Sequence, residues 1–296
     1  MTDRPGCPSC GSAAAIALHE VRDHSVSGEF FHLVRCGNCG LIRTADAPPR
    51  EAIGPYYRSE AYVSHTDSAR GLVNWLYHRV RRFTVAGKRR MAERVVGGRR
   101  GRVLDYGCGT GAFLGAMRDA GWDVTGLEPD DTARANAARL HGLDLSPPEA
   151  LADLPDGRFD VVTLWHVLEH VHDLQDTLAH LSRVLAPGGR LFIAVPNPLS
   201  LDAVHYGTAW AAWDVPRHLW HFTPSALQGL LARHGLRVER RLPMWFDSFY
   251  VSMLSEGYAR GRQRLLPALL TGLRSNLAAL RDAGRCSSLI HVAVRG

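Results

Sequence analysis

The sequence lacks any apolar run that approaches the roughly 18 residues of a membrane span. Its first residues, MTDRPGCPSCGS, also lack the apolar core of a secretory signal. Repeats and low-complexity tracts are missing as well. We therefore expect a cytoplasmic protein, in which paired cysteines hold metal more often than they form disulfides.

Charge of one sign is in only slight excess. The chain has 35 Lys and Arg against 29 Asp and Glu, with a net charge of +6, so it favours acidic partners only weakly. Hydrophobic residues at 46% and charged residues at 22% exclude disordered and fibrous classes. A chain of 296 residues has room for one large α/β domain and a small appendage.

The cysteines are concentrated near the N-terminus. Two Cys-x-x-Cys pairs stand in residues 1–45, each followed by glycine, with a strand-like aromatic stretch leading into the second pair. Two matched pairs in a short β module favour a structural zinc site over a redox dithiol, and a fully ligated zinc has no open catalytic position. The predicted ligands are Cys7, Cys10, Cys36 and Cys39.

The rest of the chain divides by pattern. Residues 46–98 are predicted to form a linker and a basic helix that ends at two glycines. Over 99–296, strand and helix patterns alternate, which predicts a parallel sheet with helices on both faces. A helical insertion is expected at 247–284, before a final edge strand that can run parallel or antiparallel to its neighbour.

The first strand of the larger region leads into a glycine-rich turn. Asp105 ends the strand, and Gly107, Gly109 and Gly111 alternate before a helix, so the backbone can approach a ligand closely. Glu128 ends the next strand, 17 positions after Gly111. A carboxylate in that place is suited to accept hydrogen bonds from both hydroxyls of a ribose.

Four segments in this order resemble the successive motifs of class I S-adenosylmethionine (SAM)-dependent methyltransferases, over about residues 100–200. They are VLDYGCGTG, VTGLEPD, GRFDVVTLWHVLEHV and LAPGGRLFIAVPN. The resemblance implies a Rossmann-like α/β fold with a seven-stranded, mostly parallel sheet. The whole chain also resembles a bacterial group of zinc-ribbon methyltransferases with DVPRHL-x-HF loops, often associated with saccharide or secondary-metabolite pathways.

The same resemblance implies how SAM is held. The methionine moiety is expected near Asp105 and Gly107, and the ribose on Glu128. The reactive methyl group is expected to face Trp165 and His166. Adenine is expected beside Pro129 and a segment near Asp153, where Glu149 is an alternative.

The residues directly after the fourth strand of such a fold narrow the choice of acceptor. The Asn/Asp-Pro-Pro-aromatic tetrapeptide of exocyclic-amine methyltransferases is replaced by Leu164-Trp-His-Val167, and no Pro-Cys pair comes after that strand. A hydroxyl, carboxyl or carbon of a small molecule or saccharide remains. The alternative is a zinc-ribbon RNA methyltransferase with basic residues at 81–90, although a solvated helix face explains these more simply.

Histidine is the expected base, because imidazole can take the acceptor's proton near neutral pH. The loop after the fifth strand contains Asp214, Arg217, His218 and His221 within eight residues. We expect His218 or His221 to be the base, Asp214 to fix its tautomer and Arg217 to bind an acidic group of the substrate. The simpler alternative is packing and helix capping, and His170 is a second candidate base.

Leucines recur at helical spacing in the insertion, with arginines at 262–281 around them. Packing onto the catalytic domain, a substrate cover, a dimer face and peripheral membrane contact all remain open. The leucines are Leu265, Leu266, Leu269, Leu270, Leu273 and Leu277.

Overall fold

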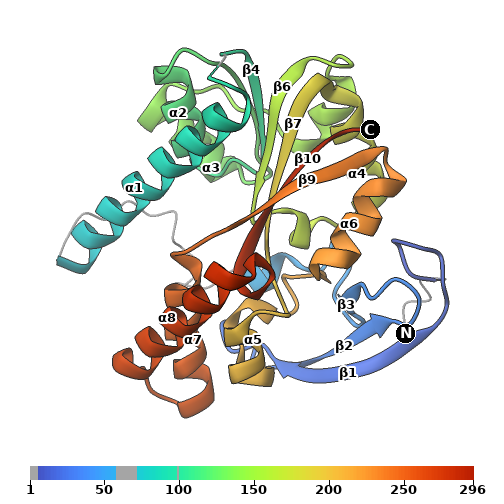
Figure 1. Ribbon diagram of the computed structural model, residues 1–296, viewed down its shortest axis with the longest axis vertical. Coiled ribbons are helices and arrows are strands. Elements are labelled where there is room, and N and C mark those ends of the chain that lie inside the picture. Colours follow the sequence, from blue (N-terminus) through green and yellow to red (C-terminus); the bar gives the residue numbers. More distant parts are fainter. Residues whose placement is uncertain (1–5, 58–71, 99) are drawn as a thin grey trace.

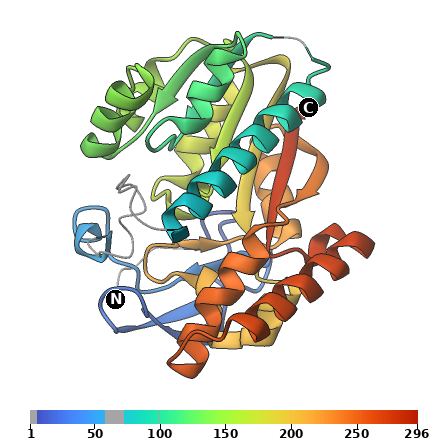
Figure 2. The same cartoon turned by 90° about the vertical axis from the view of Figure 1, so that its left-hand side faces the viewer.

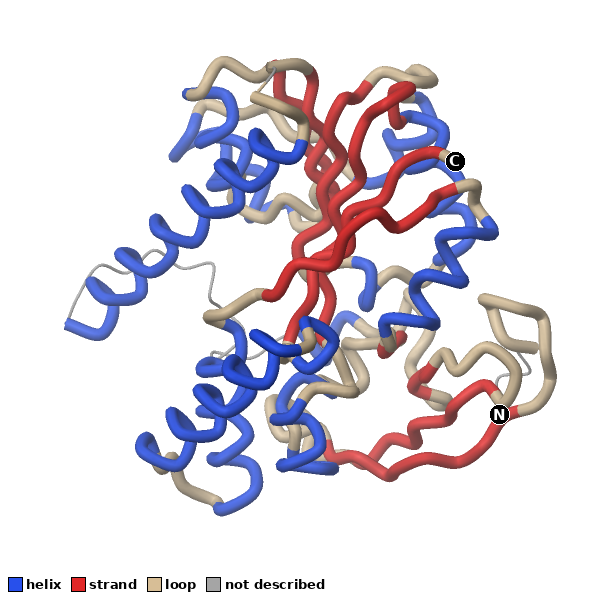
Figure 3. Tube along the Cα trace, in the orientation of Figure 1, coloured by secondary structure: helices blue, strands red, loops and turns tan. Residues whose placement is uncertain are grey.

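The computed structural model describes residues 6–57, 72–98 and 100–296 (Figure 1). Its described residues form a central six-stranded sheet, a four-stranded sheet near the N-terminus, and a group of helices beside the lower end of the central sheet (Figure 3). The central strand order is β5-β4-β6-β7-β10-β9.

Four strands of the central sheet are parallel, and their apolar residues face helices on both sides. Val103, Leu104, Val161 and Val162 have no exposed surface, because both faces of these strands are covered. The strands are β4 (Arg102–Tyr106), β5 (Asp123–Leu127), β6 (Phe159–Trp165), β7 (Leu185–Pro196), β9 (Leu236–Pro243) and β10 (Ser288–Arg295).

Helices cover the two faces of this sheet. The five helices are α1 (Leu72–Val95), α2 (Ala112–Asp119), α3 (Asp131–His141), α4 (Leu174–Val184) and α6 (Pro224–Arg233). Helices α1, α2 and α3 lie on one side of the sheet, and α4 and α6 lie on the opposite side (Figure 1). Figure 2 shows α1 running diagonally across the face that it covers.

The predicted α/β fold with a mostly parallel sheet is confirmed, with two differences. Six strands are found among the described residues instead of seven, since beside β5 there is only a single parallel bridge from Leu127 to Ser146. Pro147 and Pro148 follow at once, and proline has no N–H to extend a ladder. The last strand, β10, is antiparallel but lies between β7 and β9, so β9 is the edge.

The N-terminal sheet includes a strand from a distant part of the chain. Strands β1 (Ala15–Arg22), β2 (Phe30–Cys36) and β3 (Ile42–Thr44) form an antiparallel meander. Strand β8 (Trp220–His221) pairs with β3. The region of the expected zinc ribbon is therefore joined, through β3, to the loop that precedes α6.

Arg217 joins the N-terminal sheet to that loop. Its guanidinium is fully buried and donates to Asp23 at 3.0 Å, to Asp214 at 2.7 Å and to the carbonyl of Tyr56 at 2.9 Å. Two carboxylates and a carbonyl thus satisfy a charge that would be costly to bury alone.

Replacing Arg217 with alanine is expected to destabilise the protein by about 3–5 kcal/mol, because buried carboxylates lose their partner. Urea unfolding measures this loss. The exposed Arg240→Ala variant is the matched control, and equal stability of the two variants would contradict the buried ion-pair assignment.

The remaining helices pack together beside the lower end of the central sheet (Figure 1). They are α5 (Leu201–Tyr206), α7 (Asp247–Arg260) and α8 (Leu265–Arg281). Helices α7 and α8 form the predicted insertion between β9 and β10. Short 3-10 turns are η1 (Gly54–Tyr57), η2 (Pro148–Asp153), η3 (Leu168–His170), η4 (Gly207–Ala209), η5 (Ala211–Trp213) and η6 (Ala283–Arg285).

Candidate active site

The turn after β4 depends on glycine. Gly107, Gly109 and Gly111 have φ angles of 72°, 55° and 75°, in the left-handed region that other residues avoid. A Cβ atom at residue 107 would also lie 2.5 Å from Cγ2 of Val167. The turn therefore presents bare backbone at the carboxyl ends of β4 and β6, where ligands bind in sheets of this kind.

Glu128 faces this turn from the end of β5. Its side chain is largely buried, and Oε2 accepts the N–H of Gly109 at 2.7 Å while Oε1 accepts the N–H of Asp130 at 3.0 Å. A carboxylate has about four acceptor positions, so it can still accept two hydroxyl groups.

Asp105 and Lys88 lie near each other beneath the turn. Burial raises the pKa of Asp105 to about 7, against the lowering effects of a hydrogen bond from Thr163 and the charge of Lys88. Lys88 comes from α1, and its Nζ lies 4.4 Å from the centre of the Trp165 ring, within cation–π range. Lys88 is the only lysine of the sequence. The sequence alone does not show that it faces the site, because that depends on how α1 packs against the central sheet.

His166 and two carboxylates form a charged cluster after β6. The His166 backbone has a φ of 59°, which is unusual for histidine. Its Nε2 lies 2.9 Å from Asp247 and its Nδ1 lies 3.3 Å from Glu169. Burial lowers the pKa of His166, but these two hydrogen bonds raise it to about 10. Asp247 begins α7, so the insertion contributes a residue to the site.

His170 and His218 meet beside this cluster. Their ring centres are 4.6 Å apart at an interplanar angle of 79°. His218 Nδ1 lies 2.9 Å from the carbonyl of Ala212, and His170 Nδ1 lies 3.0 Å from the carbonyl of Arg217 and 3.1 Å from the hydroxyl of Tyr57. Burial lowers the pKa of His170 to about 4, so its ring is neutral at physiological pH.

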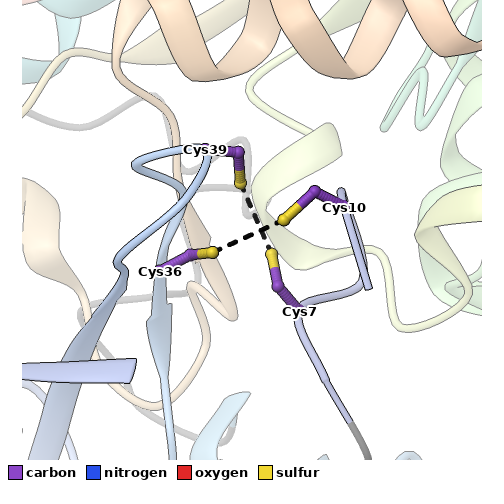
Figure 4. Close-up of side chains that lie close together, drawn as sticks. All are labelled: Cys7, Cys10, Cys36 and Cys39. Atoms are coloured by element: carbon purple, nitrogen blue, oxygen red, sulfur yellow. Dashed lines mark hydrogen bonds between the residues drawn. The ribbon is translucent and has the colours of Figure 1, made fainter. Parts of the chain in front are cut away.

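The four N-terminal cysteines converge on one point (Figure 4). Cys7 and Cys39 Sγ atoms lie 3.5 Å apart, as do those of Cys10 and Cys36. Four sulfurs around a zinc at about 2.3 Å would be roughly 3.8 Å apart, close to this spacing. Each glycine after a pair has a φ of 75°, which closes the turn at each Cys-x-x-Cys. The cluster is thus consistent with a zinc site.

A family model described as a methyltransferase domain matches residues 76–240. The match spans more than half of the chain and includes the glycine turn, Glu128 and the histidine loop. The chain belongs to this methyltransferase family. It is a class I enzyme, and SAM is its methyl donor.

Curated relatives match about half of the length of this methyltransferase. A ubiquinone biosynthesis O-methyltransferase of Bordetella avium is 36% identical over 149 residues, which are 46% of this chain and 61% of that protein. One of Xanthomonas oryzae is 34% identical over 152 residues, 47% of this chain and 63% of that protein. The chain thus spans less than two thirds of the length of these relatives.

A solved SAM-dependent methyltransferase of Archaeoglobus fulgidus has the same fold. The TM-score is 0.50 at 20% sequence identity, and the match covers 72% of this chain and 93% of the other. At that identity the likeness concerns the fold alone.

The adenine side of the methyltransferase site stays a prediction. Pro129 is exposed directly after Glu128, and Asp153 is exposed at the end of η2, which packs against β5. Glu149 is also exposed, 3.9 Å from Arg50. Both acidic residues remain candidates for the adenine amino group.

The structure corrects the expected roles in the loop at 214–222. Arg217 is fully buried in its ion pairs, so it does not reach an acceptor. His221 is buried in β8, where its Nε2 lies 3.1 Å from the Thr44 hydroxyl. Asp214 binds Arg217 and lies 3.8 Å from His218 Nε2, so a backbone carbonyl and not Asp214 fixes the His218 tautomer. The sequence does not reveal these contacts, because a loop rich in polar residues looks the same whether it binds a ligand or packs inside the protein.

Proposed function

We propose that this methyltransferase transfers the methyl group of SAM to a hydroxyl of a small molecule, with His170 and His218 at the acceptor. One observation carries the proposal. Both rings direct Nδ1 at a backbone carbonyl, and both lie beside the Glu169 carboxylate in and near the segment that follows β6. Imidazole nitrogens and a carboxylate suit an acceptor that must lose a proton, as a hydroxyl does.

The relatives support oxygen as the methylated atom, since they are ubiquinone biosynthesis O-methyltransferases. The proposal also includes a carboxyl group or a carbon atom as the methylated group, and a saccharide as the acceptor molecule. The step itself is a displacement at the sulfonium carbon. The protein then contributes mainly proximity and a route for the proton.

The contacts of the basic segment at 81–90 argue against RNA as the acceptor. Lys88 lies on the Trp165 ring, and Arg89 pairs with Glu93 at 2.9 Å. These two cations are therefore engaged within the protein.

The proposal is tested by incubating the enzyme with methyl-labelled SAM and three acceptor pools: hydroxylated aromatic compounds, saccharides and total RNA. We expect label in a small hydroxylated compound, in a base-stable ether. Label in RNA alone would overturn the proposal.

We also propose that α8 contacts an anionic membrane surface. The helix buries small residues such as Ala268, Gly272 and Ser275, while Leu266 is 69% and Leu280 is 71% exposed. Exposed arginines border the same leucines. In the part of the chain that the structure describes, no helix could span a membrane, so this contact would be peripheral.

Replacing Leu266 and Leu269 together with glutamate is expected to reduce sedimentation with anionic vesicles at least tenfold, because apolar area and charge attraction are both lost. The control is Leu140→Glu on α3, outside the α8 face. Unchanged sedimentation of the double variant would refute the membrane role. So would a wild-type dimer that becomes a monomer in the double variant.

A further inference from the structure

Three potential metal-binding side chains meet where the segment after β6 approaches the loop before β8, separately from the cysteine cluster. One ligand atom each from Glu169, His170 and His218 lies within 4.8 Å of the other two. Glu169 follows β6 in η3, and His218 comes from the loop before β8. The chain thus brings together residues that are far apart in sequence.

The carboxylate of Glu169 is only half satisfied. Its side chain has no exposed surface, and while Oε1 accepts from His166, Oε2 has no hydrogen-bond partner. An unpartnered oxygen of a buried carboxylate keeps the desolvation cost of the group with no hydrogen bond to offset it. Such an atom calls for a cation or a donor.

The two imidazoles offer no donor to that oxygen. Carbonyl groups can only accept, so the Nδ1 atoms that face Arg217 and Ala212 carry the protons. Nε2 is then the ring atom that can bind a metal ion, and in His218 it lies 3.8 Å from Asp214. A backbone carbonyl behind Nδ1 is also the partner that orients a metal-binding histidine in many proteins.

We propose that Glu169 Oε2 and the Nε2 atoms of His170 and His218 bind one divalent metal ion, which in turn binds the acceptor oxygen. Two imidazoles and one carboxylate suit Mn²⁺, Fe²⁺ or Zn²⁺ and leave coordination positions open. Glu169 and His218 are buried, and His170 is partly exposed. This inference rests on the proposed O-methylation.

The metal would act as a Lewis acid on the acceptor. The acceptor O–H bond breaks and its proton passes to solvent water, because the metal lowers the pKa of the bound hydroxyl. The oxygen then forms a bond to the SAM methyl carbon as the sulfur–carbon bond breaks. The products are the methyl ether, S-adenosylhomocysteine and one proton, so charge and atoms balance.

The test is Mn²⁺ binding to the full chain, followed by the loss of the free-ion paramagnetic resonance signal. Mn²⁺ prefers oxygen and nitrogen ligands, so it should not displace metal from the four thiolates. We expect one Mn²⁺ per chain. Glu169→Gln and His218→Gln should each weaken binding by roughly 100-fold, while His205→Gln on the exposed side of α5 should not change it.

The metal and the methyl transfer can fail separately. No Mn²⁺ binding by folded wild-type protein at millimolar concentration, or unchanged binding in both variants, would overturn the metal site. SAM-dependent methylation that survives chelation would do the same while leaving the proposed function intact. Conversely, Mn²⁺ binding without methylation of any hydroxyl would refute the proposed acceptor alone.

Discussion

Glu128→Ala is expected to weaken SAM binding by roughly 100-fold or more, because two ribose hydroxyls would each lose a hydrogen bond to a charged acceptor, about 1.5–3 kcal/mol apiece. The side chain already stands in place for this contact, held by the N–H groups of Gly109 and Asp130. Isothermal calorimetry with SAM measures the loss directly, without knowledge of the acceptor.

Two further variants separate this contact from collapse of the turn. Glu128→Gln keeps an acceptor oxygen for the Gly109 N–H, so the turn should stay formed while SAM binding still falls about tenfold. Glu51→Ala, on the exposed linker, should bind SAM normally. Wild-type affinity in Glu128→Ala would show that the ribose is not bound here.

Cys36→Ser should remove zinc and most methyl transfer together. We expect about one zinc per wild-type chain and almost none in the variant, because three ligands hold zinc much more weakly than four. Activity should fall at least tenfold although none of the four N-terminal cysteines belongs to the glycine turn. Plasma emission spectroscopy measures the metal, and turnover of labelled SAM measures the activity.

The physical link runs through β3 and β8. Leu219, beside β8, donates its N–H to the Glu169 carbonyl at 2.8 Å and accepts from the N–H of Thr44 on β3 at 3.0 Å. Cys36 packs in the same apolar cluster as Leu219 and Trp220. Cys286→Ser, outside the cluster, should keep its zinc. Full activity in zinc-free Cys36→Ser would show that the N-terminal sheet does not support the acceptor residues.

Features that depend on short sequence segments were predictable. A glycine turn with positive φ angles and a carboxylate 17 positions later follow from residues that stand close together, as do the paired cysteines. The parallel core follows from apolar strands that alternate with helices. In each case the physical cause is local, so one stretch of chain contains it.

Features that depend on contacts between residues far apart in the sequence were not predictable. The raised pKa of His166 arises in part from Asp247, which is 81 positions away. Arg217 is a core residue because Asp23, 194 positions away, meets it. The tautomers of His170 and His218 depend on backbone carbonyls, which no residue pattern reveals.

The pairing of β3 with β8 also constrains when the N-terminus can finish folding. Thr44 and His221, which meet across this pair, are separated by 177 positions. During synthesis the first three strands emerge early, but their fourth neighbour leaves the ribosome only after most of the central sheet has been made. Until then the free edge of β3 can pair with other chains. Chains shortened before residue 221 should therefore aggregate even when metal is supplied, whereas full-length chains should not.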